Sequence, residues 1–446
     1  MNVKDRFLQG FLPLFLFLGF YLLSYHLQRT DTVTLLATFS SLFVLLWFWI
    51  RNYSTLWSIF FIGLICRLLF TFHIPALSQD FYRFIWDGDI QLLGINPYLY
   101  TPNELIELID FPNAQLLYDK MGSLSAGNYS NYPPLSQYLY KVMAYFNSGQ
   151  ILPPVLALRG IYFSGEVLLF FGAKALLDYL KLPAVYLAWY FLNPLVIVEG
   201  FGNLHGESFM LGFTVLSWLY CFKRKPLLGG FFMALAIATK LLPLLLILFF
   251  FRYLGLRKFF LFSISTAIVS AILWLPFWHP EMINHYTQTI ELWFNRFEFN
   301  GSLYNIVRAI GYEIKGYNII RKLGKVTPFI TIGLVFIFSL FNSNRQPKLL
   351  LKSMLLLLSY YFFMATTVHP WYIINLIFLG IMTGYAYPIV WSMTVFWSYS
   401  AYEVAVVQEH MGWQLGAYAL VYSCFFYEIM KGRLGDHLQK SNFFSC

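Results

Sequence analysis

The chain has 446 residues, of which 59% are hydrophobic, 21% are aromatic and only 11% are charged. A soluble domain carries about a quarter charged residues, so this composition excludes a soluble globular protein and a disordered one. The net charge of +9 comes from basic residues spread over short loops between apolar runs. That distribution indicates loop anchoring and contact with anionic lipid rather than nucleic acid, and the chain is predicted to be a polytopic membrane protein.

Apolar stretches that could cross a bilayer recur along the whole chain. A spanning helix needs about 20 apolar residues, and shorter ones occur. We expect spans near 7–27, 33–50, 56–77, 152–179, 183–200, 206–222, 257–276, 326–342, 349–367, 371–385, 387–404 and 412–430. The prediction is an all-α, polytopic integral membrane helical bundle of about 12–14 transmembrane segments with both termini cytoplasmic.

The stretch 227–252 needs separate treatment because basic segments flank it on both sides. Basic loops favour the cytoplasmic side, and a single span would place one of these segments outside. We therefore expect a hairpin of two short helices, broken around Thr239, Lys240 and Pro243. An ammonium group at such a break suits a phosphate contact, although a lysine that snorkels to a lipid headgroup has the same pattern.

Two loops, 78–150 and 277–325, are too long to be simple connectors, and both fall on the outer face within one domain of residues 1–446. Long loops are usually functional, and amphipathic stretches in the first predict helices in the membrane interface. The second loop is basic, against the usual bias of outer loops. Its charges fit either an anion site or a general lipid-binding surface (Arg296, Arg308, Lys315, Arg321, Lys322 and Lys325).

The densest polar cluster, Asp80, Arg83, Asp87 and Asp89, follows directly after an apolar span. On a helix, Asp80, Arg83 and Asp87 share one face. The cluster fits a solvated interfacial helix with an internal ion pair. It equally fits a functional site, because a carboxylate at the membrane border can act as a general base on a hydroxyl.

The segments DFYRFIWDG (80–88), GINPY (94–98) and YPPL (132–135) resemble bacterial GT-C-type membrane glycosyltransferases. The nearest group is the polyprenol-phosphate-mannose-dependent mannosyltransferases. The resemblance continues in order through NPLVIVEGFGNLHGESFMLGF (193–213), ALAIATKLLPLLLILFF (234–250), FNGSLYNI (299–306) and HPWYIINL (369–376). The chain departs from the family pattern at Glu166 and Glu207, where an aspartate is expected.

This resemblance implies the GT-C architecture and an inverting transfer of a hexose, mannose in the nearest group, to a glycan or lipid acceptor. The donor would be a polyprenyl-phosphate sugar, and the acidic motif would supply the general base, for which we predict Asp80. The predicted catalytic residues are Asp80 and Asp87. The predicted substrate-binding residues are Arg83, Asp89, Asn96, Tyr98, Glu199, His205, Glu207, Lys240, Asn300, His369 and Trp371.

No organic cofactor is expected, and no CxxC or Cys/His spacing indicates a metal site. Glu199, His205 and Glu207 could bind a divalent cation, orient sugar hydroxyls, or simply form hydrogen bonds in a wet cavity. His369 and Trp371 fit either the sugar site or an aromatic anchor in the interface. Among charges inside the membrane, Arg159 and Glu166 are expected to form a structural ion pair.

The competing function is a transporter or flippase of lipid-linked saccharide. It would need polar groups that continue through the membrane to the cytoplasmic side, whereas the dense cluster here lies on one face. A non-catalytic assembly subunit would not need the acidic cluster. The resemblance of the motifs to bacterial enzymes favours a bacterial inner membrane, with the site facing the periplasm or outer space.

Overall fold

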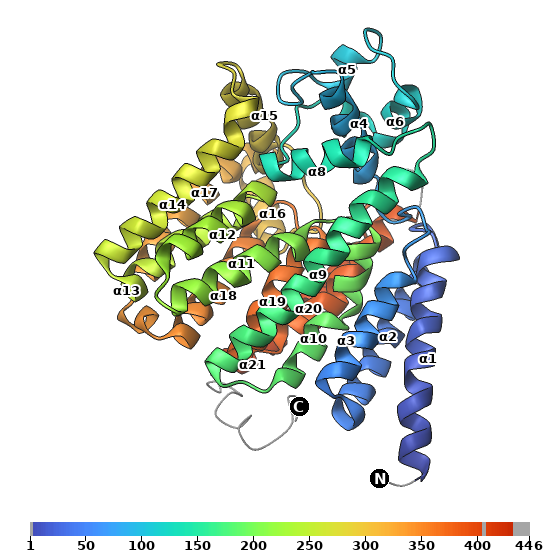
Figure 1. The fold of residues 1–446 in the computed structure, drawn as a ribbon, viewed down its shortest axis with the longest axis vertical. Coiled ribbons are helices and arrows are strands. Elements are labelled where there is room, and N and C mark those ends of the chain that lie inside the picture. Colours follow the sequence, from blue (N-terminus) through green and yellow to red (C-terminus); the bar gives the residue numbers. More distant parts are fainter. Residues whose placement is uncertain (1–2, 404–406, 431–446) are drawn as a thin grey trace.

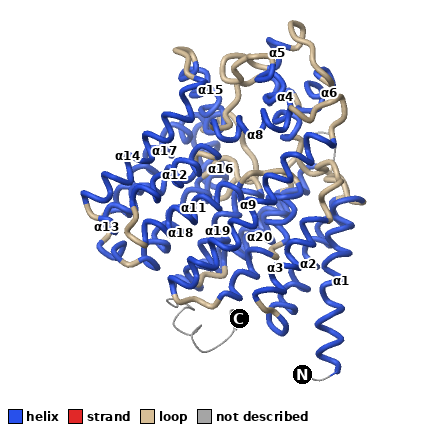
Figure 2. The backbone as a smooth tube through the Cα atoms, viewed as in Figure 1, coloured by secondary structure: helices blue, strands red, loops and turns tan. Residues whose placement is uncertain are grey.

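The computed structural model describes residues 3–403 and 407–430, and its regular elements there are helices. The one exception in these ranges is an isolated parallel β-bridge between Phe299 and Thr367. The predicted all-α polytopic bundle is confirmed (Figures 1 and 2). Its first part contains α1 (Val3–Tyr25), α2 (Thr32–Tyr53), α3 (Leu56–Leu68), α9 (Leu152–Leu180), η1 (Ala184–Leu187), α10 (Ala188–Phe191), η2 (Val196–Gly202) and α11 (Glu207–Phe222).

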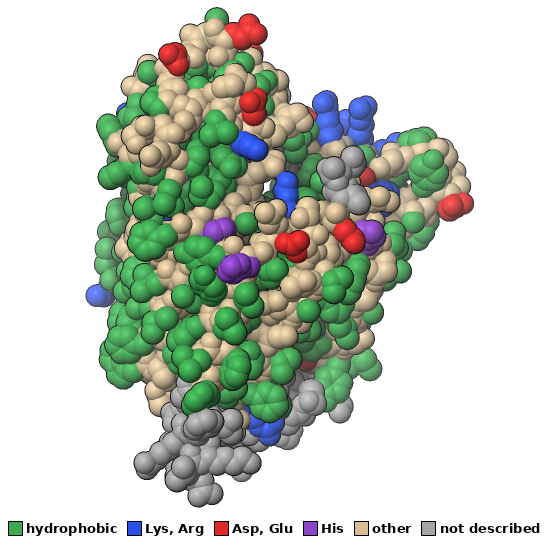
Figure 3. Space-filling model, turned by 90° about the vertical axis from the view of Figure 1, so that its right-hand side faces the viewer, with side chains coloured by type: hydrophobic (Ala, Val, Ile, Leu, Met, Phe, Trp, Pro, Cys, Tyr) green, Lys and Arg blue, Asp and Glu red, His purple; other side chains and the backbone are tan. Residues whose placement is uncertain are grey.

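The second part of the bundle packs against the first through one large apolar core. It contains α12 (Pro226–Thr239), η3 (Leu242–Phe249), α13 (Phe250–Leu254), α14 (Leu256–Trp274), η4 (Leu275–Phe277), α17 (Ile320–Ser339), η5 (Asn342–Arg345), α18 (Pro347–Met364), η6 (Pro370–Ile373), α19 (Ile374–Thr383), α20 (Tyr387–Thr394), η7 (Val395–Tyr402) and α21 (Met411–Met430). Hydrophobic side chains are spread across the lower half of the face in Figure 3, where charged side chains are few.

Fewer helices than predicted meet the length and hydropathy of a full span. In the described residues these are Thr32–Asn52, Leu152–Leu180, Leu256–Phe277, Ile320–Ser339 and Pro347–Met364, with a sixth if the pair Ala184–Phe191 and Val196–Gly202, bent by 65°, counts as one. Most of the other predicted spans are apolar helices of 10–17 residues or lie in helices interrupted by 3₁₀ turns. Composition located the apolar runs but overestimated how many continue as one straight helix.

One end of the bundle, here called the capped end, carries most of the two long loops (Figure 1). Its elements are α4 (Asp80–Leu92), α5 (Pro102–Leu105), α6 (Ala114–Met121), α7 (Ser123–Ala126), α8 (Pro134–Ala144), α15 (Met282–Asn295) and α16 (Leu303–Lys315). The helices of the first loop share a small core of their own, which includes Phe84, Trp86 and Tyr140. The first loop is therefore a folded cap with an interior, more than a set of helices lying in the interface.

The predicted hairpin break is present. The α12 helix ends at Thr239, Lys240 is extended (φ −150°, ψ 145°), and η3 starts at Leu242 with Pro243 in its first turn. Proline fixes φ and removes a hydrogen-bond donor, so the chain resumes as a new helix instead of continuing α12. The break faces the capped end, because Ser136 of α8 donates a hydrogen bond to the Thr239 carbonyl at 2.8 Å.

The expected ion pair between Arg159 and Glu166 is wrong. Glu166 instead pairs with Arg67 of α3 at 3.0 Å, with both side chains buried. Arg159 lies nearer the capped end of α9 and donates to the carbonyls of Thr71 and Gly202, each at 2.8 Å. Both arginines have tertiary partners that spacing along one helix could not reveal.

Candidate active site

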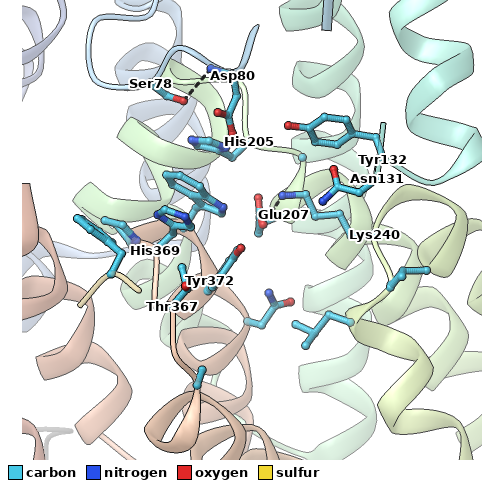
Figure 4. A pocket seen from close by; sticks show the side chains of 18 of the residues that line it. Ser78, Asp80, Asn131, Tyr132, His205, Glu207, Lys240, Thr367, His369 and Tyr372 are labelled. Carbon is cyan, nitrogen blue, oxygen red and sulfur yellow. Dashed lines mark hydrogen bonds and ion pairs between the residues drawn. The ribbon is translucent and has the colours of Figure 1, made fainter. Parts of the chain in front are cut away.

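A cavity of about 680 Å³ lies where the capped end meets the bundle. Much of its polar lining comes from five places that are far apart in the sequence: the start of α4, the loop before α8, the turn between η2 and α11, the break after α12, and the segment before η6 (Figure 4). Six predicted site residues line it: Asp80, His205, Glu207, Lys240, His369 and Trp371. The structure thus brings together residues separated by nearly 300 positions.

Asp80 is the first residue of α4, and its carboxyl group faces the cavity with 37% of the side chain exposed. The Ser78 hydroxyl accepts a hydrogen bond from the Asp80 backbone N–H at 3.2 Å, which fixes the turn (Figure 4). Desolvation raises the pKa of Asp80 to about 6, opposed by the positive charge of Lys240 and reinforced by Glu207. A carboxyl with this pKa is ionised at neutral pH and is a stronger base than an ordinary aspartate.

His205 lies directly beside Asp80. Its Nδ1 atom is 3.9 Å from the nearer Asp80 oxygen, and its Nε2 atom is 3.6 Å from a Glu199 oxygen. The imidazole stacks on Trp371 with ring centroids 3.6 Å apart, and Trp371 stacks on His369 at 4.4 Å. This stack forms a rigid wall of the cavity and holds His205 in place.

The turn that carries His205 is strained. Leu204 has φ +63°, a conformation that a residue with a Cβ rarely adopts. The preceding η2 element is a π-helix, and its Glu199 accepts hydrogen bonds from Asn203 at 3.0 Å and Tyr399 at 2.7 Å. Irregular helices and strained turns are concentrated at functional sites. Here the π-helix and the turn together place the His205 imidazole beside the Asp80 carboxylate.

Lys240 and Glu207 form an ion pair at the centre of the cavity wall (Figure 4). The Lys240 side chain is 24% exposed, whereas the Glu207 side chain is buried at 2%. A buried carboxylate beside an ammonium fixes the position of that ammonium. The cavity therefore has an immobilised positive charge at the hairpin break, within the field of Asp80.

The other side of the cavity is apolar. It is formed by the start of η3 and the middle of α17, through Leu241, Leu242, Leu244, Leu245, Pro328 and Ile332. Leu244 and Ile332 also have 53% and 48% of their surface exposed. The apolar side of the cavity therefore includes exposed hydrocarbon surface.

Arg83 and Asp87 do not line the cavity. Arg83 pairs with Asp87 at 2.6 Å, and Asp87 also accepts hydrogen bonds from Ser130 at 2.6 Å and Gln137 at 2.9 Å. The Asp87 side chain is completely buried. It ties α4 to the loop before α8, so its role in this structure is to hold the cap together.

Four further predicted substrate-binding side chains form hydrogen bonds within the protein, and all of them except the half-buried Asn96 are buried. The Asn96 amide donates to the Phe277 carbonyl at 2.8 Å, and the Tyr98 hydroxyl donates to the Tyr132 carbonyl at 2.6 Å. Asn300, with φ +53°, donates to the Val368 carbonyl at 3.2 Å. Asp89 accepts from Asn147 at 2.6 Å. None of these side chains lines the cavity, and neither does Glu199, which reaches it through His205.

The environment of Asp89 gives a stability prediction. Desolvation raises the pKa of this carboxyl to about 7, against the Asn147 hydrogen bond that lowers it. In the unfolded chain an aspartate has a pKa of about 3.9. The free energy of unfolding therefore falls as the pH rises from about 4 to 7. We expect Asp89→Asn to raise stability at pH 8 by about 2 kcal/mol, measured as the melting temperature of the purified protein.

The gain from Asp89→Asn should shrink as the pH falls toward 4, because the wild-type carboxyl is then protonated in the folded protein and increasingly protonated in the unfolded chain. Asp119→Asn is the matched control, since Asp119 is an exposed aspartate of the same cap. A gain that is equal at pH 4 and pH 8 would contradict the assigned burial cost.

Several lining residues were not predicted from the sequence. Ser78, Gln79 and Asn131 adjoin motifs that the sequence does display, so they could have been found by extending those motifs by one or two residues. Arg29, Tyr399 and Tyr402 carry no such signal. Arg29 stands 4.8 Å above the Tyr402 ring, and this contact between a loop and a distant helix is a product of the fold alone.

Two of the three side chains considered for a divalent cation, Glu199 and Glu207, have partners within the protein. In residues 3–403 and 407–430, no group of three or more His, Cys, Asp or Glu side chains is arranged to hold a metal ion. Glu207 is engaged by Lys240, and Glu199 by Tyr399 and Asn203.

Together the fold and the cavity define an all-helical, multi-pass membrane protein with a polar site at one end of its bundle and an apolar flank open to lipid. The family model for the N-terminal domain of alpha-(1->6)-mannopyranosyltransferases, the MptA_B family, matches residues 16–255. This is just over half of the chain, and the chain belongs to this family. The matched region contains Asp80, His205, Glu207 and Lys240.

A curated relative supports the assignment. The chain is similar to alpha-(1->6)-mannopyranosyltransferase A of Mycobacterium tuberculosis (strain ATCC 25618 / H37Rv), with 24% identity over 168 residues. The similarity covers 37% of this chain and 31% of that protein. It thus spans about a third of the length of the relative.

Proposed function

We propose that this protein transfers a mannosyl group from a polyprenyl-phosphate donor to a hydroxyl of a glycan or lipid acceptor, with inversion at the anomeric carbon. The observation that carries the proposal is the position of Asp80, a cavity-facing carboxylate at the membrane boundary next to an apolar flank. The family and the relative, both named as mannopyranosyltransferases, support mannose as the sugar.

The two sides of the cavity fit the two parts of such a donor. An isoprenoid chain is apolar and remains in the membrane, where the exposed surfaces of Leu244 and Ile332 are available to it. The sugar phosphate is polar and enters the lining that contains Lys240 and His205. Because Lys240 is held by Glu207, its positive charge is in place before the phosphate leaves.

The proposed reaction is a single displacement. Asp80 takes the proton from the acceptor hydroxyl, and the acceptor oxygen forms a bond to the anomeric carbon as the bond from that carbon to the phosphate oxygen breaks. The prenyl phosphate departs as an anion stabilised by Lys240, and the proton remains on Asp80 until it is lost to water. One displacement inverts the configuration, and the leaving group is already a stable anion, so we propose that no organic cofactor takes part.

His205 is a positioning residue in this mechanism, and its stack with Trp371 keeps the acceptor side of the cavity rigid. The predicted location is unchanged: an inner membrane, with the capped end on the periplasmic or outer side. A flippase of lipid-linked saccharide would use similar headgroup contacts, but it would have no need of a carboxylate with the raised pKa of Asp80.

The test is to incubate the purified protein in lipid nanodiscs with mannosyl, glucosyl and galactosyl polyprenyl phosphates and an oligomannoside acceptor. We expect consumption of the mannosyl donor, release of prenyl phosphate, and a product with the opposite anomeric configuration. Movement of intact donor across a vesicle membrane without cleavage would show a flippase instead. Retention of configuration would contradict the single displacement.

A further inference from the structure

The turn between α16 and α17 concentrates positive charge at the capped end. Lys315 lies in the last turn of α16, Gly316 ends that helix with φ +73°, and Arg321, Lys322 and Lys325 lie in the first turns of α17. All four basic side chains are exposed. Outer segments next to a span are normally poor in basic residues, so these charges require a specific explanation.

In the described ranges these four cations are not neutralised by carboxylates of the protein. Within the described ranges, none of the four forms an ion pair with a carboxylate, and the polar contact seen is Lys322 donating to the Tyr317 hydroxyl at 2.7 Å. The nearby Glu298 is already engaged by Arg308 at 3.0 Å and by Asn318. The turn therefore presents unneutralised charge to the surroundings.

The position of α16 places this charge at the level of lipid headgroups. One stripe of α16 is apolar and exposed: Leu303, Ile306, Ile310 and Ile314 are between 36% and 69% exposed. The adjoining face, with Tyr304 and Gly311, is buried against the protein. An amphipathic helix of this kind lies with its apolar stripe in the membrane interface, and its last residue is Lys315.

Two of the four cations are aligned with the cavity. Arg321, Lys325, Pro328 and Ile332 are spaced by four, three and four residues, so they lie on one face of α17. Pro328 and Ile332 line the apolar side of the cavity. The stripe that forms the cavity wall therefore continues toward the capped end as Arg321 and Lys325, whereas Lys315 and Lys322 lie off it.

We propose that Arg321 and Lys325 form a capture site for the phosphate of a prenyl-phosphate lipid, outside the cavity and in line with its apolar flank. The inference rests on the proposed function, since it names the route by which that donor reaches Lys240. The lipid chain runs along the exposed apolar surface of α17, where Val326 and Phe329 are 53% and 75% exposed. The phosphate is held at the turn before it passes into the cavity.

The four basic residues of this turn provide both the test variant and a matched control variant. Arg321→Gln/Lys325→Gln removes two charges from the stripe, and Lys315→Gln/Lys322→Gln removes two charges beside it. The three proteins are compared in the Asp80→Asn background, in nanodiscs of zwitterionic lipid, for binding of radiolabelled undecaprenyl phosphate. Since basic residues near a membrane surface are worth about 1 kcal/mol each, we expect Arg321→Gln/Lys325→Gln to weaken binding about thirtyfold and the control pair to stay within about twofold.

Two further readouts complete the test. In the active protein, Arg321→Gln/Lys325→Gln should raise the donor KM by a similar factor and leave kcat unchanged, and high salt should bring the wild type toward the variant. Equal weakening by both pairs would show general attraction of anionic lipid and would overturn the capture site, as would no weakening by either. If either of these results is found and the wild type still transfers mannose, only the capture site is contradicted. If the wild type neither binds prenyl phosphate nor consumes the donor, the proposed function is contradicted as well.

Discussion

Asp80→Asn is expected to lower the rate of mannosyl transfer about a thousandfold, in line with the loss of a general base. Asparagine has the same shape as aspartate but cannot take the proton from the acceptor hydroxyl. The backbone hydrogen bond from residue 80 to Ser78 does not depend on the side chain, so the start of α4 is retained. The measurement is turnover of mannosyl donor, together with the melting temperature of each protein.

The control for this variant is Asp110→Asn, which removes an exposed carboxylate from the same cap. It should leave both turnover and stability unchanged. Full activity of Asp80→Asn would remove Asp80 from the role of base, and a lowered melting temperature without loss of turnover would make it a structural residue.

The pH profile tests the same assignment independently. Below a pH of about 6 the Asp80 carboxyl holds a proton and cannot accept another, so kcat/KM should rise through that pH and then level off. Asp80→Asn should retain a low rate without this limb. A profile of the wild type that is flat from pH 5 to pH 8 would be inconsistent with Asp80 as the base.

Lys240→Gln is expected to lower kcat about a hundredfold, because a preorganised positive charge at the leaving phosphate is lost. The same change should move the acid limb of kcat/KM to higher pH, since Lys240 lowers the pKa of Asp80. Turnover at saturating donor and the pH profile are the measurements. Lys120→Gln, on an exposed face of the cap, serves as the control.

Removal of Lys240 also leaves the buried Glu207 without its partner, which costs stability. The double variant Lys240→Gln/Glu207→Gln separates the two effects, because it restores a neutral pair. If the double variant recovers full turnover, Lys240 serves only to neutralise Glu207. Continued loss of kcat in a stably folded double variant supports the phosphate contact.

The sequence predicted the local features of the site better than its assembly. The break at Lys240 followed from basic segments on both sides of an apolar run with a proline, and the structure has that break. The acidic cluster that begins at Asp80 was marked by its place next to a span, and Asp80 lines the cavity. Both are properties of a short stretch of chain, which local rules can reach.

The roles of Asp80 and Asp87 show where those rules end. Spacing places both residues on one face of α4, but it does not say where along the helix the cavity begins. Seven residues correspond to about 10 Å along a helix axis, enough to put Asp80 at the cavity and Asp87 among Arg83, Ser130 and Gln137. The cap packs on the bundle through contacts between residues distant in sequence. Only those contacts determine where along α4 the cavity lies.

The amino-acid sequence alone determined that the chain is a helical membrane protein, where its apolar runs are broken, and which acidic segment borders the membrane, because each depends on composition or on neighbours along the chain. The tertiary structure decided which polar residues share a cavity, that Glu166 pairs with Arg67 and not with Arg159, and that the face of α17 below Arg321 and Lys325 becomes a cavity wall. Those outcomes depend on how helices far apart in the chain are placed against one another, and a polar side chain finds its partner only after that packing is complete.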